Sequence, residues 1–209
     1  MGNVLVLSPH LGDAEIYCGG TMAKLIEGGS EIFLASFSYA QELLSLGFSR
    51  NAIKKESLEA ADILGIPIDN LYRFDLEVRE FPSVRQIILN NMELLRKDIR
   101  PGMVLLPSSS IIHQGYETIY KEGMRVFSEI TLLGYENIWR DMGHSHMSTY
   151  VRLKESHIMK KMEAMKCYES QMKRNDNLPQ KMAILAKLRG SQIKCQYAEI
   201  FENIRMVIV

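Results

Sequence analysis

Short apolar runs alternate with helical stretches along this 209-residue chain, and this alternation restricts its fold more than any other feature. Glycine and proline mark the boundaries between the stretches. The sequence predicts strands over 3–8, 31–38, 71–75, 103–107 and 149–153. It predicts helices over 20–28, 50–64, 83–98, 116–130, 154–172 and 178–189. Strands separated by helices imply βαβ units, so we expect an α/β domain with a mainly parallel sheet.

Length and charge limit the classes of protein that the chain can belong to. The length fits one domain, and we expect residues 1–209 to form it. The 25 Lys and Arg balance the 25 Asp and Glu, so no net positive charge favours nucleic acid. No apolar run is long enough for a transmembrane segment, and the chain opens in a strand rather than in a signal peptide. Three Cys without CxxC spacing suit a reducing compartment, so we expect a cytoplasmic protein.

A polar loop follows the first apolar run, at the position where parallel α/β folds carry their chemistry. It reads Ser-Pro-His-Leu-Gly-Asp-Ala-Glu-Ile-Tyr-Cys-Gly-Gly-Thr over residues 8–21. It resembles the metal loop of the PIG-L/LmbE-type N-acetylsugar deacetylases, whose pattern is Pro-His-Pro-Asp-Asp-x-Glu-x-Gly-Cys-Gly-Gly-Thr. In this chain Gly12 stands where that pattern has its first Asp.

Five further segments are similar to segments of the same family and occur in the same order. They are Val78–Phe81 with the helix after it, Pro107–Tyr116, Gly134–Trp139, Lys161–Gln171 and Leu188–Phe201. The resemblance therefore extends over nearly the whole chain. It implies a Rossmann-like three-layer domain.

The resemblance also implies a role for each site position. A catalytic zinc takes three protein ligands and a water, and a carboxylate accepts the proton of that water. By position, the ligands correspond to His10, Asp13 and Tyr116, where Tyr116 replaces a His. Gly12 replaces the general base. His113 corresponds to the His that steadies the developing oxyanion.

Two more polar residues of the family pattern are missing beside His113. Gly115 replaces the acid that orients this His, and Ile111 replaces an Asp on the substrate side. Residues of the scaffold are kept: Cys18-Gly19-Gly20, Ser170-Gln171 and Arg189-Gly190. The departures are thus concentrated in the site, and no intact catalytic set is left. We therefore expect a pseudoenzyme.

No cofactor is firmly predicted, because only His10 and Asp13 are good zinc ligands. Zn²⁺ is the ion that this remnant site would hold. Each residue also has a structural interpretation. His10 can bond the following turn, and Asp13 can act as a helix-end carboxylate. Arg79 and His113 either bind a sugar hydroxyl or phosphate or are structural.

Two other polar features of the sequence are candidates for replacing the missing base and the missing metal ligand. Glu15 is expected to be structural, since the family pattern has a Glu there beside its base. His144 and His146 have the spacing of a metal pair, but such a pair without a nearby acid is more typical of a solvated loop.

Two functions follow from these observations. The first is a non-hydrolytic sugar-binding or scaffolding protein, linked to glycan or sugar-nucleotide biosynthesis, with a small sugar or sugar nucleotide as ligand. The second is an active zinc-dependent N-acetylsugar deacetylase whose rebuilt metal site recruits Tyr116, Glu15 or His144. We favour the first, because four polar functions are lost together. The 13 Met and the absence of net charge also predict a homo-oligomer.

Overall fold

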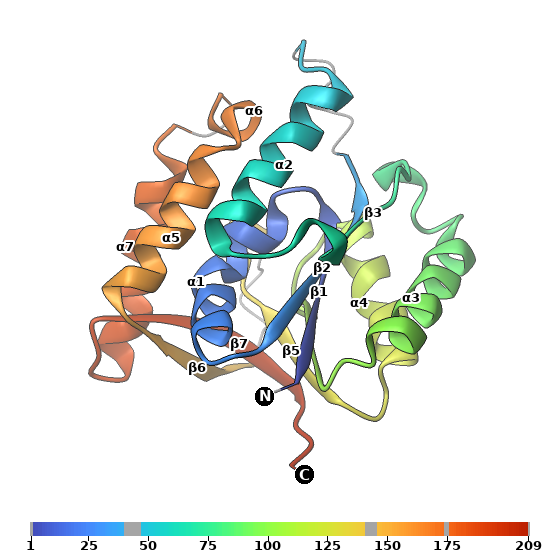
Figure 1. The fold of residues 1–209 in the computed structure, drawn as a ribbon. Coiled ribbons are helices and arrows are strands. Elements are labelled where there is room, and N and C mark those ends of the chain that lie inside the picture. Colours follow the sequence, from blue (N-terminus) through green and yellow to red (C-terminus); the bar gives the residue numbers. More distant parts are fainter. Residues whose placement is uncertain (1, 40–46, 141–145, 174–175, 209) are drawn as a thin grey trace.

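The computed structural model describes residues 2–39, 47–140, 146–173 and 176–208, and these form three layers (Figure 1). The middle layer is a seven-stranded sheet of order β3-β2-β1-β4-β5-β7-β6. The strands are β1 (Asn3–His10), β2 (Glu31–Ser38), β3 (Leu71–Arg73), β4 (Met103–Pro107), β5 (Thr131–Tyr135), β6 (Met147–Leu153) and β7 (Tyr197–Arg205). The five strands from β3 to β5 pair in parallel, and β7 and β6 add to one side antiparallel. This confirms the predicted α/β class and mainly parallel sheet.

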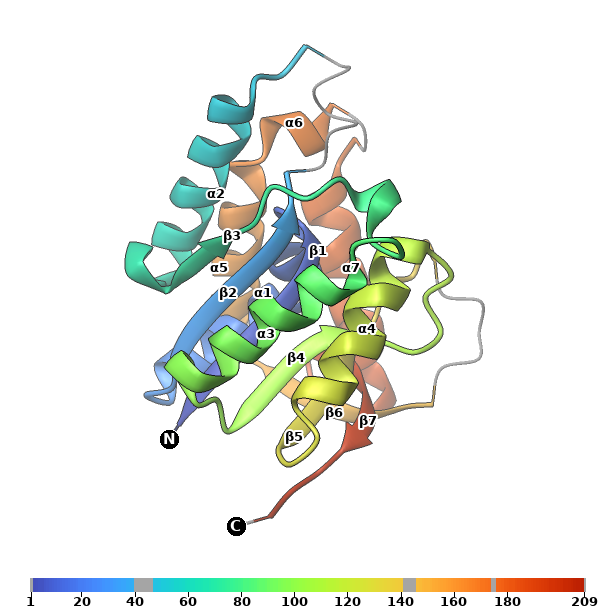
Figure 2. The ribbon, with the colours of Figure 1, turned by 90° about the vertical axis from the view of Figure 1, so that its right-hand side faces the viewer.

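Helices cover both faces of the sheet (Figures 1 and 2). On one face lie α1 (Asp13–Glu27), α2 (Arg50–Leu64), α5 (Glu155–Lys166), the short α6 (Glu169–Met172) and α7 (Leu178–Gln192). On the other lie α3 (Arg85–Ile99) and α4 (Gln114–Val126). Two short 3₁₀ turns, η2 (Ile68–Asn70) and η3 (Val78–Glu80), precede β3 and α3. None of the helices in these ranges is long and apolar enough to cross a membrane.

The first strand shows why the apolar runs predicted a parallel sheet. Val4 and Val6 pack into the core beneath α1 and α2, whereas Leu5 and Leu7 pack into the core beneath α3 and α4. A strand that is buried on both faces needs apolar side chains at every position rather than at alternate ones. The strand therefore brings its carboxyl end, with His10, into the centre of the molecule.

Some of the predicted elements were wrong. Strands β5 and β7 were not predicted, because β5 is a run of only five residues that contains Gly134 and because β7 contains Glu199 and Glu202. The helix expected over 116–130 is α4, which ends at Val126. The first helix begins at Asp13 rather than at residue 20, so most of the predicted polar loop is helical. The helix expected over 154–172 is divided into α5 and α6.

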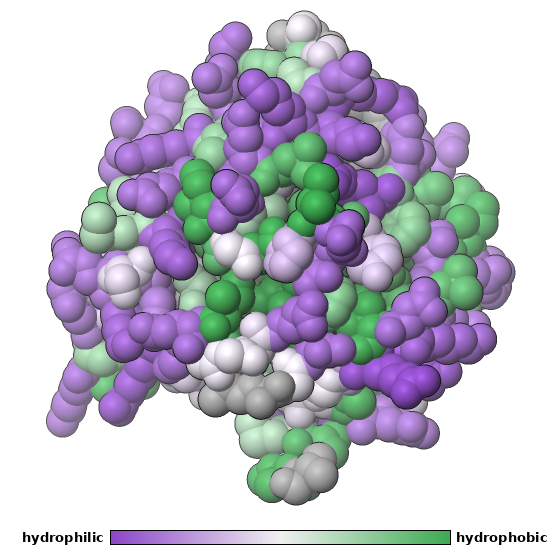
Figure 3. Space-filling model, viewed as in Figure 1, coloured by the Kyte–Doolittle hydropathy of each residue, from purple (hydrophilic) through white to green (hydrophobic). Residues whose placement is uncertain are grey.

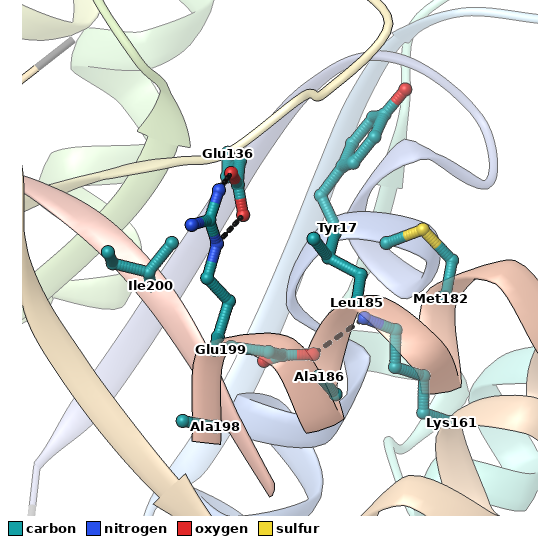
Figure 4. A pocket seen from close by; sticks show the side chains of 10 residues that line it. Tyr17, Glu136, Lys161, Met182, Leu185, Ala186, Ala198, Glu199 and Ile200 are labelled. Carbon is teal, nitrogen blue, oxygen red and sulfur yellow. Dashed lines mark hydrogen bonds and ion pairs between the residues drawn. The ribbon is translucent and has the colours of Figure 1, made fainter. Parts of the chain in front are cut away.

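Glu199 is tolerated in β7 because it is paired inside the protein. Lys161 Nζ donates to Glu199 Oε1 at 2.6 Å, and these side chains are 2% and 6% exposed. The backbone N–H groups of Gly20 and Thr21 donate to the two carboxylate oxygens at 3.0 and 2.7 Å. Figure 4 shows this ion pair beside a second one, between Glu136 and Arg189, at a small cavity. The ion pair between Lys161 and Glu199, with the N–H groups of Gly20 and Thr21, joins α5, β7 and α1.

Replacing Lys161 by Met is expected to lower the free energy of unfolding by about 3–5 kcal/mol, because it leaves a buried carboxylate without its partner. Lys160 is exposed and supplies the matched control. Chemical denaturation of Lys161→Met and Lys160→Met measures the difference. Equal losses in the two variants would show that the buried pair does not stabilise the junction of α1, α5 and β7.

Candidate functional site

The candidate site lies at the carboxyl ends of β1 and β4, which are neighbours in the sheet. The helices that follow these strands, α1 and α4, cover opposite faces, and such a switch point is where open α/β sheets bind ligands. His10 ends β1 and Asp13 begins α1. His113 is the N-cap of α4, and Tyr116 lies in its first turn. The fold therefore brings these four predicted site residues together.

His10 and Asp13 form a buried pair. His10 Nδ1 lies 3.0 Å from Asp13 Oδ2, and the backbone N–H of His10 donates to the same oxygen at 3.2 Å. The two residues are 6% and 7% exposed. Because an ionised carboxylate only accepts hydrogen bonds, Nδ1 carries the proton in this pair. In its neutral form the imidazole of His10 therefore has its lone pair on Nε2.

Tyr116 forms a buried wall against both histidines. Its ring centroid lies 5.7 Å from that of His10 and 5.4 Å, edge-on, from that of His113. Burial first, and then the negative charge of Asp13, raise the pKa of the Tyr116 phenol well above its usual value. The hydroxyl therefore stays protonated, and the Asp13 carboxylate is a negative charge near it. Asp13 thus has His10 as its hydrogen-bond partner and Tyr116 as an electrostatic neighbour.

The backbone of α4 contacts the His113 ring. Its Nδ1 accepts a hydrogen bond from the N–H of Gly115 at 3.2 Å. The neutral ring therefore has its proton on Nε2. A Cβ at Gly115 would lie 2.5 Å from Val78 Cγ2, so an orienting Asp does not fit there unless the Val78 side chain moves. The Val78 side chain thus fills the space that a side chain at position 115 would need.

Gly12, the position of the family's base, is enclosed by Tyr168. Gly12 is the N-cap of α1 with φ of 92°, in the left-handed region, and a Cβ there would lie 3.3 Å from the Tyr168 ring. The Tyr168 hydroxyl donates to Glu15 Oε1 at 2.7 Å. Burial raises the pKa of Glu15, which is only 3% exposed. This arrangement agrees with a structural role for Glu15.

Replacing Gly12 by Asp is expected to lower the free energy of unfolding by about 1–3 kcal/mol, because a side chain is strained at positive φ and meets Tyr168. Gly29 has a similar φ of 83° with no atom within 4 Å of its Cβ position. Gly29→Asp therefore measures the backbone cost alone. Urea denaturation of both variants gives the comparison. A smaller loss in Gly12→Asp than in Gly29→Asp would contradict the contact with Tyr168.

The other predicted residues lie around this group. Arg79 is exposed in η3, where its carbonyl accepts from Gln114 Nε2 at 3.2 Å at the start of α4. Ile111 is buried, at 3% exposure. His146 is exposed just before β6, and His144 lies outside the described residues. Within the described ranges no group of three or more His, Cys, Asp or Glu is placed to hold a metal ion.

Tyr17, Trp139 and Arg140 lie at the site but were not singled out from the sequence. The Tyr17 ring stacks on that of Tyr135 at 5.6 Å and is tilted against that of Trp139 at 6.3 Å. The Arg140 guanidinium carbon lies 5.6 Å from the centroid of the Tyr116 ring. Trp139 ends a segment that the family resemblance included, and Arg140 is the next residue. The position of Arg140 directly after this segment was the one sequence signal that could have assigned it to the site.

The donor set can be compared with the requirements of a catalytic zinc ion. Such an ion takes three protein ligands and keeps one position for water. Here His10 and Asp13 supply two strong ligands, but they face each other, and the third position holds the protonated phenol of Tyr116. The residues present therefore do not fit a catalytic zinc ion in this arrangement.

Comparisons with known proteins agree with the fold. A diacetylchitobiose deacetylase from Thermococcus kodakarensis is 26% identical over 142 residues, which are 66% of this chain and 52% of that protein. The chain thus spans about half the length of this curated relative. The structure of the conserved protein TT1542 from Thermus thermophilus is similar with a TM-score of 0.82 and 20% identity, over 100% of this chain and 97% of that one.

A second solved structure shows that this fold is shared by proteins with a different named activity. GalB from Pseudomonas putida, a 4-carboxy-2-hydroxymuconate hydratase, is similar with a TM-score of 0.82 and 18% identity, over 100% of this chain and 98% of that one. The family model described as PIG-L, GlcNAc-PI de-N-acetylase, matches residues 5–127. Because this match includes β1, β4 and the four residues gathered at their ends, and covers more than half of the chain, the protein belongs to the PIG-L family.

Proposed function

We propose that this protein is a non-hydrolytic member of the PIG-L family that binds a small sugar or sugar nucleotide and serves glycan or sugar-nucleotide biosynthesis in the cytoplasm. The observation that carries the proposal is the buried phenol of Tyr116 beside His10 and Asp13. The resemblance assigns the third ligand to this position, where the phenol is kept protonated by burial and by the charge of Asp13. A protonated phenol is a poor zinc ligand.

The lack of a carboxylate at position 12 supports the same proposal. Gly12 has no carboxylate, and Tyr168 packs against it. Glu15 is the nearest acid along the chain after Asp13, but it is buried and bonded to Tyr168. Loss of a positioned general base typically lowers a rate by about 10²–10⁴-fold. The chain has therefore replaced both the metal shell and the base by packed side chains.

An N-acetylamino sugar is the ligand class that the relatives favour. The matching family is described as a GlcNAc-PI de-N-acetylase, and the curated relative is a diacetylchitobiose deacetylase. We propose that His113 donates from Nε2 to a sugar oxygen, and that the exposed Arg79 of η3, whose carbonyl contacts Gln114 at the start of α4, supplies a second donor. These two residues bind ligand in our proposal, and neither needs a metal ion for that role.

The proposal is tested by saturation-transfer NMR with N-acetylglucosamine and N,N′-diacetylchitobiose. We expect binding, with the acetyl groups intact after prolonged incubation. His113→Ala should weaken binding, and His146→Ala, which changes an exposed histidine outside the group, should not. No saturation transfer from the protein to either sugar would contradict the proposed sugar site.

We also propose that the protein is a homo-oligomer. Its surface carries exposed apolar side chains, among them Ile184 and Leu188 on α7, at 67% and 54% exposure. Ile208 is 88% exposed in the segment that projects from the body of the molecule below β7 (Figures 1 and 3). Light scattering at micromolar concentration is expected to give a mass above that of one chain. A single species with the mass of a monomer would contradict this.

A further inference from the structure

Arg140 is a cation at the candidate site that forms no ion pair with another residue that the structure describes. Its guanidinium rests on the face of the buried Tyr116 ring, 5.6 Å from the centroid, and the residue is exposed. Among the described residues, no carboxylate lies within ion-pair distance of this guanidinium. A guanidinium stacked on an aromatic ring is held in one orientation while its N–H groups remain available to an anion.

The turn that carries Arg140 is fixed before any ligand binds. The backbone N–H of Trp139 donates to Asn137 Oδ1 at 3.2 Å, and that of Arg140 donates to the Asn137 carbonyl at 3.1 Å. The Arg140 carbonyl accepts from the N–H of Ile112 at 3.2 Å, which ties the turn to the loop after β4. Asn137 is fully buried. A site that is ordered in advance loses less entropy when it binds.

An aromatic surface adjoins this cation. Trp139 is 44% exposed, and its ring is tilted against that of Tyr17 at 6.3 Å. Glu136, immediately before the turn, is held by Arg189 of α7, as Figure 4 shows. An exposed indole next to an exposed guanidinium offers a flat apolar face and a pair of parallel N–H donors. This combination suits a ring that bears a carboxylate or a phosphate.

We propose that Trp139 and Arg140 form a subsite for the anionic group of a sugar acid or sugar phosphate, with the sugar ring against Trp139 and the anion on Arg140. This inference rests on the proposed sugar-binding function and names the class of its ligand. The guanidinium supplies positive charge at a site where the protein has replaced a metal ligand by Tyr116. Carboxylate and phosphate share this recognition chemistry, so both are tested.

The single Trp of the chain makes the test direct, because all tryptophan fluorescence reports on Trp139. The fluorescence is titrated with N-acetylglucosamine 6-phosphate, glucuronate, N-acetylglucosamine and inorganic phosphate. We expect saturable changes with one or both anionic sugars, at affinities at least about tenfold above that for N-acetylglucosamine. Higher salt should weaken this binding. Equal affinities for neutral and anionic sugars would overturn the proposal.

Two variants separate the local charge from the net charge. Arg140→Gln should weaken binding of the anionic sugars by about tenfold or more and leave that of N-acetylglucosamine within about twofold. Arg96→Gln removes the same charge from the last turn of α3, which leads to the amino end of β4 and away from the candidate site, and should have no effect. If Arg140→Gln binds the anionic sugars as the unaltered protein does, Arg140 is not the anion site. If inorganic phosphate binds as tightly as the sugar phosphate, the role of Trp139 is wrong.

The result can be distinguished from failure of the proposed function. Binding of N-acetylglucosamine without preference for an anion would support the sugar site and overturn this inference. Conversely, hydrolysis of the sugar would contradict the non-hydrolytic function, whereas the dependence of anion affinity on Arg140 would still support the subsite.

Discussion

Purified protein is expected to release no acetate from N-acetylglucosamine or N,N′-diacetylchitobiose above the background rate, with or without added zinc. Two independent absences lead to this result. No carboxylate at position 12 accepts a proton from water, and this loss alone typically lowers a rate by about 10²–10⁴-fold. The remnant ligands do not present the three donors that make a zinc-bound water acidic.

Acetate release is measured over a range of enzyme and zinc concentrations, in parallel with a chelator-treated sample. The decisive control is His10→Ala, because His10 is the first residue of the remnant site. A low rate that is equal in the unaltered protein and in His10→Ala would be a contaminant. Robust turnover that disappears in His10→Ala would show that the chain has rebuilt its chemistry, and it would contradict the proposed function.

The central part of the fold could be predicted from the sequence, because each of its strands is buried on both faces. Residues 3–8, 31–38 and 103–107 are apolar runs for this reason, and the structure places β1, β2 and β4 over them. Strand β7 could not be predicted from such a pattern. Its two glutamates are buried by contacts with distant residues, Glu199 with Lys161 and Glu202 with Ser109. A local window of sequence cannot show such pairing.

Part of the candidate site could also be predicted from the sequence. The family resemblance identified His10, Asp13, His113 and Tyr116, and the fold brings these four residues together. The side chains packed against Gly12 and Gly115 could be found only in the structure. Tyr168, between α5 and α6, lies against Gly12, and Val78 fills the space beside Gly115. Arg140 belongs to the site only because its turn folds over the first turn of α4.

Because of these contacts, introducing the family's residue costs a different amount of packing energy at each position. An Asp at position 12 meets Tyr168 at a strained φ, and an Asp at position 115 meets Val78 Cγ2. Tyr116 is different, because an imidazole is smaller than a phenol and fits inside the same wall. The replacement of Tyr116 by His is therefore the change that tests the metal shell with the least effect on packing.

Tyr116→His is expected to raise the affinity for Zn²⁺ by about 100-fold. It replaces the buried phenol beside Asp13 by an imidazole near His10, so that three strong zinc ligands lie in one cluster. Structural zinc sites with four ligands bind with about 10–16 kcal/mol, so one ligand contributes about 3 kcal/mol, which corresponds to about 100-fold. Competition with a chromophoric chelator measures the affinity.

The matched control is Tyr116→Phe, which also removes the hydroxyl but adds no ligand. Its zinc affinity should remain within a few-fold of that of the unaltered protein. Equal affinities of Tyr116→His and Tyr116→Phe would mean that position 116 does not face the remnant ligands. If Tyr116→His binds zinc but releases no acetate, the role of the ligand at position 116 is separated from that of the carboxylate at position 12. A metal-activated water in this variant would still have no carboxylate at position 12 to accept its proton.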